Sequence, residues 1–491
     1  MFFFKKEQLM YLCRVTRKVL RMVMATHTLY TNTIVALCTP QGSGALALIR
    51  ISGDHAIDVA DAMSRLASGK KLTALPTHTI HLATITDNTH ATIDHVLLLL
   101  MRAPKTFTGN DTAEITCHNN PFIIQAIIEQ ALIHGARLAQ PGEFTKQAVL
   151  NSKLDLVQAE ALNEVIHANT QVGLKKALAQ LQGTLSAELV AIEKLLLKAL
   201  TLSEASFEFL DEEALFDTQI RECIKTISSM ITTIKTQFDQ QQQIRQGFRI
   251  ALVGSVNAGK SSLFNALLKK ERAIVTPIAG TTRDTVEAGL YRHGTYLTLV
   301  DTAGLRLTQD IIEQEGIKRS WHEAALADII LLVDDHSRTP HIQEQEWYEK
   351  LKTEYAHKII IIHNKCDQQT FTNQDSITPS AVSEKTGNGI AISCTQKSGI
   401  GLVEKQIAEK INALFEKDQA PYLLNQRQFT LVLQVEKQLE AVTQQLSLQK
   451  IHYELISHHL KDALSVAAEL TGKTIQEQMF NEIFSTFCVG K

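Results

Sequence analysis

Residues 248–268 read FRIALVGSVNAGKSSLFNALL, and this stretch decides the fold of the middle of the chain. The run RIALV is typical of a strand buried on both faces, and SLFNALL is typical of a helix. Between them the pattern G-x-x-x-x-G-K-[ST] is matched by Gly254, Gly259, Lys260 and Ser261. A loop in this setting points its N–H groups at phosphate oxygens, and the helix N-terminus favours the same negative charge. We therefore predict a phosphate-binding loop; a glycine turn that only caps the helix is the alternative.

Three short motifs follow this loop along the chain. DTAG (301–304) ends an apolar run, where an aspartate can hold Mg²⁺ through water and a glycine N–H can meet a γ-phosphate. NKCD (364–367) ends another run, and its aspartate can accept hydrogen bonds from N1 and N2 of guanine, a donor pair that adenine lacks. ISCT (392–395) stands where a guanine-supporting loop is expected. The order predicts GTP as the ligand, with Lys260 on the β- and γ-phosphates and Ser261 on Mg²⁺.

The flanking segments predict a multidomain α+β protein. Between 31 and 150, strand-like runs such as THTIHLATI alternate with turn residues and the helical segment NPFIIQAIIEQALIHGARLA, which favours an α+β domain. In 151–246 and 417–491, apolar residues recur every three or four positions, as in amphipathic helices. Residues 247–416 alternate buried strands with helices, so we predict a Ras-like α/β P-loop domain inserted into a discontinuous all-α domain. Residues 1–30 form an N-terminal extension.

Composition limits the partners and the compartment. The 491 residues carry a formal net charge of −3, so contact with a nucleic acid needs a local basic patch or a partner subunit. The seven cysteines form no C-x-x-C pair and no zinc-type spacing, which suits a reducing, cytoplasmic setting. No apolar run is long enough to cross a bilayer, and we expect no stable membrane association. The basic, amphipathic residues 1–23 leave a targeting peptide, a surface anchor and an over-long start open.

The DTAG motif lacks the residue that usually orients the attacking water. Ras-like enzymes place a glutamine after D-x-x-G, but this chain has Leu305, which cannot hydrogen-bond water. Arg283 and Arg306 are near in sequence, yet neither is marked as an arginine finger. The side-chain carbonyl of Asn257 and the backbone carbonyls of TPIAGTT (276–282) can together hold a monovalent cation beside the phosphates. An ordinary Asx turn is the alternative for Asn257.

The chain resembles a known family. Its GTPase motifs resemble those of the TrmE–Era–EngA–Septin-like group, in which TPIAGTTRD corresponds to switch I and Thr282 to an Mg²⁺ ligand beside Ser261. Over 31–491 it resembles the MnmE (TrmE) family of tRNA-modification GTPases, through TIVALCTPQGSGALALIRISG, TFTGNDTAEITCH, ARLAQPGEFTKQAVLNSKLDLVQAEAL and the terminal FCVGK. The chain departs from the family at Val256 (commonly proline), at CHNNP (commonly GHGGP) and at Cys394 (commonly alanine).

The motifs and the resemblance together imply a set of GTP-binding residues: Asn257, Ala258, Gly259, Lys260, Ser261, Ser262, Thr276, Pro277, Ile278, Ala279, Gly280, Thr281, Thr282, Asp301, Thr302, Ala303, Gly304, Asn364, Lys365, Asp367, Ser393, Cys394 and Thr395. In the family, K⁺ takes the role of the cation inferred above, bound by Asn257, Thr276, Ile278 and Thr281, and promotes G-domain dimerisation. The acid that positions the water falls on Glu313, for which a solvated helix residue is the alternative.

The resemblance also implies a folate site in residues 31–150, the domain through which the family dimerises. A 5-formyl- or 5,10-methylene-tetrahydrofolate would be bound by Arg50, Glu114, Lys153 and Lys491. Cationic side chains suit the carboxylates of the folate, and a glutamate suits the donor edge of its pterin. Taken singly, each of these residues reads as part of a surface salt bridge.

The C-terminal FCVGK raises a choice for Cys488. A prenylation box requires two aliphatic residues after the cysteine and a small or apolar last residue, so CVGK is rejected as one. The resemblance implies that the tail folds back, with Cys488 near the folate site and active in the modification chemistry. A small buried hydrophobe is the alternative for this thiol.

The resemblance implies a GTP hydrolase that acts with an FAD-dependent MnmG-type partner in a heterotetramer. The product would be a 5-aminomethyl or 5-carboxymethylaminomethyl group on the wobble uridine (position 34) of certain tRNAs, and the protein itself would be a homodimer. One alternative is an Era/EngA-like ribosome-assembly GTPase switch, which predicts a KH-like domain with a GXXG clamp. No such clamp follows the GTPase motifs. A GTPase tethered to a membrane through residues 1–23 is the other alternative.

Overall fold

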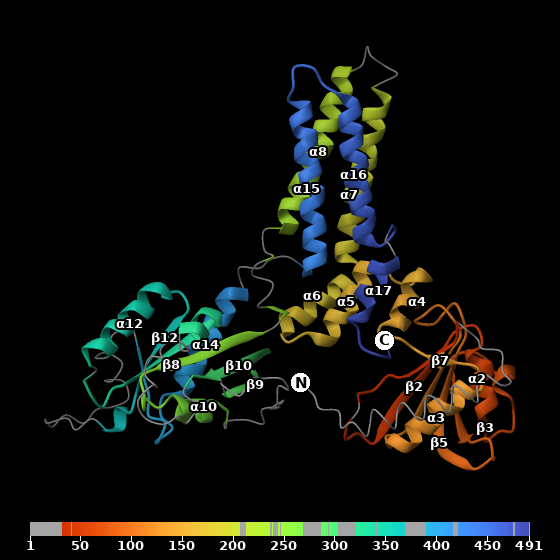
Figure 1. The fold of residues 1–491 in the computed structure, drawn as a ribbon, viewed down its shortest axis with the longest axis horizontal. Helices are drawn as coiled ribbons and strands as arrows, with labels where there is room; N and C mark the ends of the chain where they lie inside the picture. The colour runs from red at the N-terminus through yellow and green to blue at the C-terminus, as the bar shows by residue number, and fades with distance from the viewer. Residues whose placement is uncertain are drawn as a thin grey trace. The chain divides into compact units, whose positions relative to one another are not determined.

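The structure is a computed structural model that describes residues 32–40, 42–206, 213–235, 238, 244–245, 247–268, 286–292, 294–302, 321–339, 341–368, 389–415, 421–474 and 477–490. It forms two compact units (Figure 1). The first unit contains the described residues up to Asn163, together with Leu181–Ile227 and the segment that begins at Leu431. The second comprises Glu164–Gln180 and Ser228–Thr430. The domain boundaries expected from the sequence stay a prediction.

The first unit contains a seven-stranded mixed sheet in the order β3-β4-β5-β6-β2-β1-β7. Its strands are β1 (Ile34–Leu37), β2 (Leu46–Ser52), β3 (Ser64–Leu66), β4 (Thr79–Thr86), β5 (Thr92–Met101), β6 (Thr112–His118) and β7 (Arg137–Leu138). Only β1 and β7 pair in parallel; the other neighbours are antiparallel. The register places Arg50 of β2 directly opposite Glu114 of β6, which brings two predicted folate residues together.

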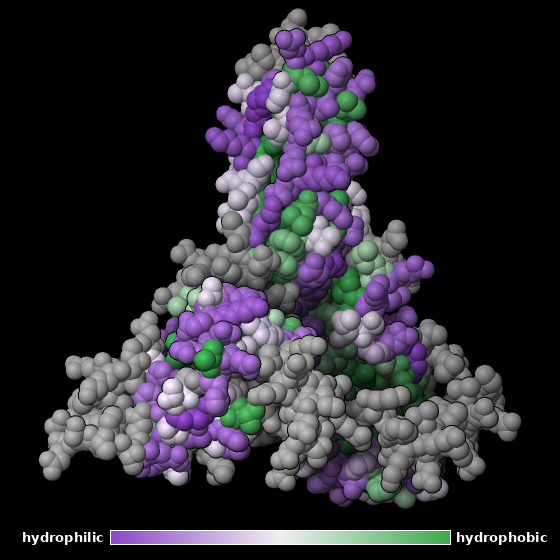
Figure 2. Space-filling model, turned by 60° about the vertical axis from the view of Figure 1, so that its left-hand side comes forward, coloured by the Kyte–Doolittle hydropathy of each residue, from purple (hydrophilic) through white to green (hydrophobic). Residues whose placement is uncertain are grey.

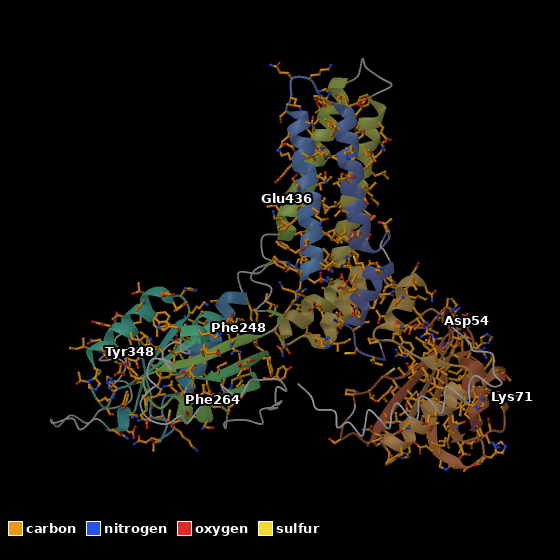
Figure 3. All side chains as sticks on the ribbon, in the orientation of Figure 1. Asp54, Lys71, Phe248, Phe264, Tyr348 and Glu436 are labelled. Atoms are coloured by element: carbon orange, nitrogen blue, oxygen red, sulfur yellow. The ribbon has the colours of Figure 1, made fainter. Side chains whose placement is uncertain are left out.

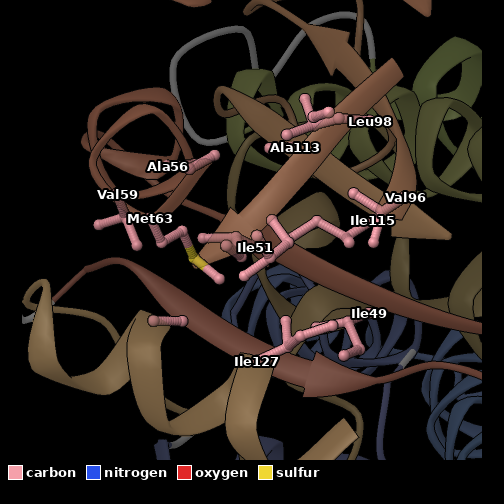
Figure 4. Close-up of a cluster of buried hydrophobic side chains, with 14 of the residues drawn as sticks. Ile49, Ile51, Ala56, Val59, Met63, Val96, Leu98, Ala113, Ile115 and Ile127 are labelled. Carbon is pink, nitrogen blue, oxygen red and sulfur yellow. The ribbon is translucent and has the colours of Figure 1, made fainter. Parts of the chain in front are cut away.

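Period-two alternation along the strands creates the core of this sheet. Val96, Leu98 and Leu100 of β5 are buried, whereas their neighbours His95 and Leu97 are exposed. The buried face packs against α2 (Ala56–Met63) and α3 (Pro121–Ile133), and Figure 4 shows Met63 beside Ile51 and Ile127 beside Ile49. Helix α3 begins where expected because Asn120 caps it: the Asn120 side chain accepts from Phe122 N at 2.9 Å.

The opposite face of this sheet exposes apolar side chains. On β4, Ile80 and Leu82 are 64% and 59% exposed, and on β5 Leu97 is 50% exposed. Leu82 lies opposite Leu97 in the register, so these side chains are neighbours. A contiguous apolar surface of this kind is characteristic of an interface.

Helices make up the rest of the first unit, and three of them continue into the second, as the three-and-four spacing predicted. They are α4 (Glu143–Leu150), α5 (Leu156–His167), α7 (Thr184–Ala205), α8 (Glu213–Lys235), α15 (Gln426–Leu446), α16 (Tyr453–Thr471) and α17 (Glu477–Ser485). Helices α7 and α16 pack together through a buried hydrogen bond between Ser203 Oγ and Ser457 Oγ of 2.9 Å. Side chains from segments separated by more than two hundred residues thus form one bundle, and its surface in Figure 2 is largely hydrophilic.

The second unit contains the six-stranded sheet β13-β12-β11-β8-β10-β9. Its strands are β8 (Phe248–Gly254), β9 (Val286–Arg292), β10 (Thr295–Asp301), β11 (Ile329–Asp335), β12 (Ile359–Asn364) and β13 (Ile390–Ala391), and only β9 pairs antiparallel. Apolar clusters cover both of its faces, as continuous apolar runs require. Helices α6 (Gln171–Leu181), α10 (Lys260–Leu268), α12 (Ile342–Glu354) and α14 (Ile400–Phe415) accompany it.

Two further short elements are the 3₁₀ helices η1 (Leu72–Ala74) in the first unit and η3 (Cys366–Gln368) in the second. Within the part of the chain that the structure describes, no helix combines the length and the apolar character needed to cross a membrane. The predicted multidomain α+β fold with an α/β P-loop domain is confirmed by these sheets and helices.

Candidate functional site

The predicted phosphate loop connects β8 to α10. Two of its residues have left-handed backbone, Asn257 with φ 62° and Gly259 with φ 95°. A Cβ on Gly259 would lie 2.1 Å from Nδ2 of Asn364, and a Cβ on Gly254 would lie 2.1 Å from the Val333 carbonyl oxygen. Both motif glycines are therefore required by close approach of the neighbouring strands.

Lys260 occupies the centre of this loop. Its side chain is buried, and Nζ donates to the carbonyl oxygens of Gly254 at 2.7 Å and Ser255 at 2.6 Å. Burial lowers the pKa of the Lys260 ammonium, and the negative charges of Asp301 and Glu344 oppose that change. A phosphate placed in the loop would restore the favourable charge environment that burial removes.

The other loop and strand-end residues surround this lysine. Ser261 and Ser262 are exposed in the first turn of α10, where backbone N–H groups are free of helical partners. Asp301 is buried at the end of β10, and the next residue, Thr302, donates from Oγ1 to the Leu252 carbonyl at 2.8 Å. This arrangement brings the ends of β8 and β10 to the N-terminus of α10, as phosphate and Mg²⁺ binding requires.

The NKCD motif is tied to the phosphate loop through Asn364. Asn364 Nδ2 donates to the Ala258 carbonyl at 2.9 Å. In the turn after Asn364, Cys366 N donates to the Ile392 carbonyl at 3.2 Å. Asp367 follows in η3, where its side chain is exposed. The structure therefore brings the NKCD motif to the same end of the sheet as the phosphate loop.

The ISCT segment follows β13 at this end of the sheet. Ser393 is buried and Thr395 is exposed. Burial raises the pKa of the half-buried Cys394 thiol to about 11, so this thiol is neutral at physiological pH. The phosphate loop, the first two residues of DTAG, NKCD and ISCT thus meet at one end of the second sheet.

Sequence reasoning missed the ion pairs that link these motifs. Lys365, whose φ is 62°, donates from Nζ to Oδ2 of Asp335 at 2.6 Å. Arg338 binds both carboxylate oxygens of Glu344, at 2.9 and 3.0 Å, and also donates to Ser255 Oγ at 3.2 Å. Arg338 Nε lies 3.7 Å from Asp335, so a polar network runs from the phosphate loop to the guanine motif. The only signal in the sequence is the pair of aspartates that ends β11.

Asp335 is charged in this network. Burial alone would raise the pKa of Asp335, but hydrogen bonds from Lys365 and Ser337 outweigh burial and hold that pKa below its usual value. The carboxylate is therefore ionised at neutral pH, and its pair with Lys365 stays intact there. Asp335 has the position and the charge to hold the backbone turn of the NKCD motif.

We predict that Asp335→Asn weakens guanine-nucleotide binding about tenfold, because a charge-assisted hydrogen bond is worth about 1.5 kcal/mol. The quantity to measure is the dissociation constant of a fluorescent GDP analogue. Glu349→Gln is the matched control, since Glu349 forms an exposed pair with Lys352 at 2.9 Å on α12. Equal affinities of the two variants would remove the proposed positioning role of Asp335.

Several predicted residues lie outside the described residues. These are the switch residues Thr276, Pro277, Ile278, Ala279, Gly280, Thr281 and Thr282, together with Ala303, Gly304, Leu305, Glu313 and Lys491. The structure therefore describes one predicted K⁺ ligand, Asn257, and one predicted Mg²⁺ ligand, Ser261.

The predicted folate residues Arg50 and Glu114 form an ion pair in the first unit. Arg50 Nε donates to Glu114 Oε1 at 2.8 Å. The Arg50 guanidinium carbon also lies 5.6 Å from the centroid of the Phe107 ring and 5.3 Å from that of Phe144. Lys153 is exposed, and no described contact joins its side chain to this group.

The C-terminal tail folds back onto these residues. Gly490 O accepts from Cys38 Sγ at 3.1 Å and from Arg50 Nη1 at 3.4 Å, and Cys488 O accepts from Gly142 N at 3.2 Å. The tail is anchored by the packed side chains of Phe480, Phe484, Phe487 and Leu156. Cys488 itself is exposed, so the alternative of a small buried hydrophobe does not apply to it.

Comparison with known proteins agrees with this architecture. Residues 33–153 match the family described as GTP-binding protein TrmE N-terminus, and residues 156–488 match the MnmE helical domain. The tRNA modification GTPase MnmE of Flavobacterium psychrophilum is 34% identical over 468 residues, which cover 94% of this chain and 100% of that protein. The chain belongs to the MnmE family of tRNA modification GTPases. The Enterococcus faecalis MnmE is 35% identical over 474 residues, covering 95% of this chain and 100% of the relative.

Solved structures resemble the chain over a part of its length. A variant of Aquifex aeolicus Era bound to GDP·AlF4⁻ gives a TM-score of 0.26 at 22% identity, covering 39% of this chain and 66% of Era. The G domain of the T. maritima FeoB iron transporter gives a TM-score of 0.24 at 21% identity, covering 33% of this chain and 98% of that domain. The resemblance to the MnmE family inferred from the sequence is confirmed by the two family matches and by relatives named as tRNA modification GTPases.

Proposed function

We propose that the chain hydrolyses GTP with Mg²⁺ and K⁺ and, with an FAD-dependent MnmG-type partner, modifies C5 of the wobble uridine (position 34) of certain tRNAs. The group installed is 5-aminomethyl or 5-carboxymethylaminomethyl. The observation that carries this proposal is the match of about a third of all residues to MnmE proteins along 94% of the chain. The protein would act in the cytoplasm as a homodimer that joins its partner in a heterotetramer.

The proposed binding of GTP is supported by the geometry of the phosphate loop. Asn364 approaches Gly259 so closely that no side chain fits there, which keeps the loop backbone accessible to phosphate oxygens. Ser261 and Thr282 would hold Mg²⁺, which neutralises charge on the phosphates. Lys260 would bind the phosphates, and Asp367 would orient the guanine.

The attacking water needs a partner because Leu305 replaces the usual glutamine. The carboxylate of Glu313 would hold this water in its place. A carboxylate can accept a hydrogen bond from water, whereas the hydrocarbon side chain of leucine cannot.

A potassium ion would supply positive charge beside the phosphates, held by Asn257, Thr276, Ile278 and Thr281. The left-handed backbone of Asn257 and its exposed side chain support this role, since the side-chain carbonyl is available to a ligand. We predict that replacing Na⁺ with K⁺ at constant ionic strength raises the GTPase rate several-fold. Equal rates in the two salts, with nucleotide affinity unchanged, would contradict the cation role.

A tetrahydrofolate carrying a 5-formyl or 5,10-methylene group would supply the one-carbon unit, and it would be held by Arg50, Glu114, Lys153 and Lys491. The half-buried Arg50 and Glu114 beside the Phe107 and Phe144 rings fit a flat pterin with a polar edge. The folded-back tail brings the Gly490 carbonyl to Arg50, and Cys488, two residues earlier, has an exposed side chain. These contacts support a role for Cys488 in the modification chemistry.

The homodimer is supported by the exposed face of the first sheet. Ile80, Leu82 and Leu97 are each at least half exposed and lie on adjacent strands. A second copy that covered this face would remove their apolar surface from water, at roughly 25 cal/mol for each Å² buried.

The decisive experiment is mass analysis of wobble nucleosides in tRNA from cells that lack this protein. We expect the C5 modification to disappear and to return when the wild-type chain is supplied. The Asp367→Asn variant should restore it poorly, because its GTP affinity would be much weaker. Unchanged wobble uridines in the deletion strain would refute the proposed function.

A further inference from the structure

Five cationic side chains gather along one rim of the first sheet, beside its edge strand β3. We call this surface the β3 rim; it comprises Arg65, Lys70, Lys71, Arg102 and Lys105. Arg65 lies on β3, and a turn closed by Gly69 N donating to the Leu66 carbonyl leads directly to Lys70 and Lys71. Figure 3 shows Lys71 at the outer edge of this unit.

Hydrogen bonds hold the two segments of the rim side by side. Arg102 Nη2 donates to the carbonyls of Thr73 at 2.9 Å and Leu75 at 3.4 Å, in and after the 3₁₀ helix that follows Lys71. The Nε2 atom of His78 lies 2.9 Å from the Lys105 carbonyl oxygen. The segments 70–78 and 102–105 are therefore in contact, and their cations share one surface.

The positive charge of this rim is balanced only in part by described carboxylates. Arg65, Lys70, Lys71 and Lys105 are exposed, and none forms a salt bridge with a described carboxylate. Two described carboxylates touch the rim: Asp61 accepts from Leu72 N and Asp111 from Ala103 N. Other lysines of the chain do pair with carboxylates, as in Lys352–Glu349, Lys405–Glu409 and Lys461–Glu204.

We propose that the β3 rim binds the sugar–phosphate backbone of the tRNA substrate. A chain of net charge −3 repels a polyanion as a whole, so contact needs a concentrated basic surface such as this one. The cations are on an open rim rather than in a pocket, which suits successive phosphates along a backbone more than a single small anion. The proposal rests on the proposed function, which makes tRNA the substrate.

The test compares two triple variants that remove the same charge from the full-length chain. The rim variant is Lys70→Gln, Lys71→Gln, Lys105→Gln. The control is Lys352→Gln, Lys405→Gln, Lys461→Gln, at lysines that already have carboxylate partners. Binding of unfractionated tRNA is measured as a function of salt concentration, and circular dichroism checks that both variants are folded.

We expect the rim variant to bind tRNA about tenfold more weakly than wild type, and the control to stay within about twofold. The slope of log K against log salt should become shallower by about two, since each lost phosphate contact removes roughly 0.7 to 0.9. The GTPase rate of the rim variant without tRNA should be unchanged, because its three lysines belong to the other compact unit.

Three results would overturn the assignment. The first is a rim variant whose tRNA affinity and salt slope equal those of the wild type. The second is a control variant that loses as much tRNA affinity as the rim variant. The third is loss of binding to phosphatidylserine vesicles with tRNA binding intact, which would assign the rim to a lipid surface. A wild-type protein that binds no tRNA would overturn the proposed function as well, so the two failures are distinguishable.

Discussion

The Gly259→Ala variant is expected to lose guanine-nucleotide affinity by a factor of a hundred or more, which corresponds to about 2.7 kcal/mol. The added Cβ would lie 2.1 Å from Asn364 Nδ2, and that amide cannot withdraw because it is buried and donates to Ala258 O at 2.9 Å. The left-handed φ of 95° adds backbone strain for any residue with a side chain. Relieving the clash would move the loop N–H groups away from the phosphates.

Titration with a fluorescent GDP analogue measures this effect. Gly42→Ala is the control, because a Cβ there meets nothing within 4 Å and the residue lies far along the chain from the loop. A thermal melt separates loss of binding from loss of folding. Wild-type affinity in Gly259→Ala would mean that the loop adapts to the added Cβ, and that the close approach of Asn364 does not restrict nucleotide binding.

The second large effect is expected for Asp367→Asn. The carboxylate can accept two hydrogen bonds from guanine, each worth about 1.5 to 3 kcal/mol when charge-assisted, so GTP affinity should fall about a hundredfold or more. Asp367 is exposed in η3, so the substitution removes no buried contact and the fold should be unaffected.

Xanthosine triphosphate provides the positive control for this variant. It carries an oxygen where guanine has its 2-amino group, and the new carboxamide can donate to that oxygen. The variant should therefore bind xanthosine triphosphate more tightly than GTP. Unchanged preference for GTP would show that another residue selects the base.

The phosphate loop could be predicted because it is local. Strand β8, the glycines and helix α10 occupy twenty-one consecutive residues, and each part has a pattern of its own. The strands of the first sheet could also be predicted, because apolar runs between turn residues and the helical segment that begins at Asn120 are properties of short stretches of sequence. Which side chains of β5 are buried could not, since Val96 to Met101 are all apolar.

The polar network behind the loop could not be predicted in this way. Arg338 and Ser255 are 83 residues apart, and Lys365 and Asp335 are 30 apart; they meet because β11 pairs with both β8 and β12. Each of these side chains reads by itself as a solvated charge. The adjacency of Arg50 and Glu114 likewise depends on the register of β2 and β6, which sequence spacing does not reveal.

The docked tail has a consequence for biosynthesis. The hydrogen bond from Cys38 to Gly490 spans 452 residues, so a ribosome finishes the first strand long before it makes the segment that covers it. At about 5 to 20 residues per second the interval is roughly 20 to 90 seconds. During that time the nascent sheet lacks its final covering, and the contacts around Arg50 are completed only after Gly490 has been made.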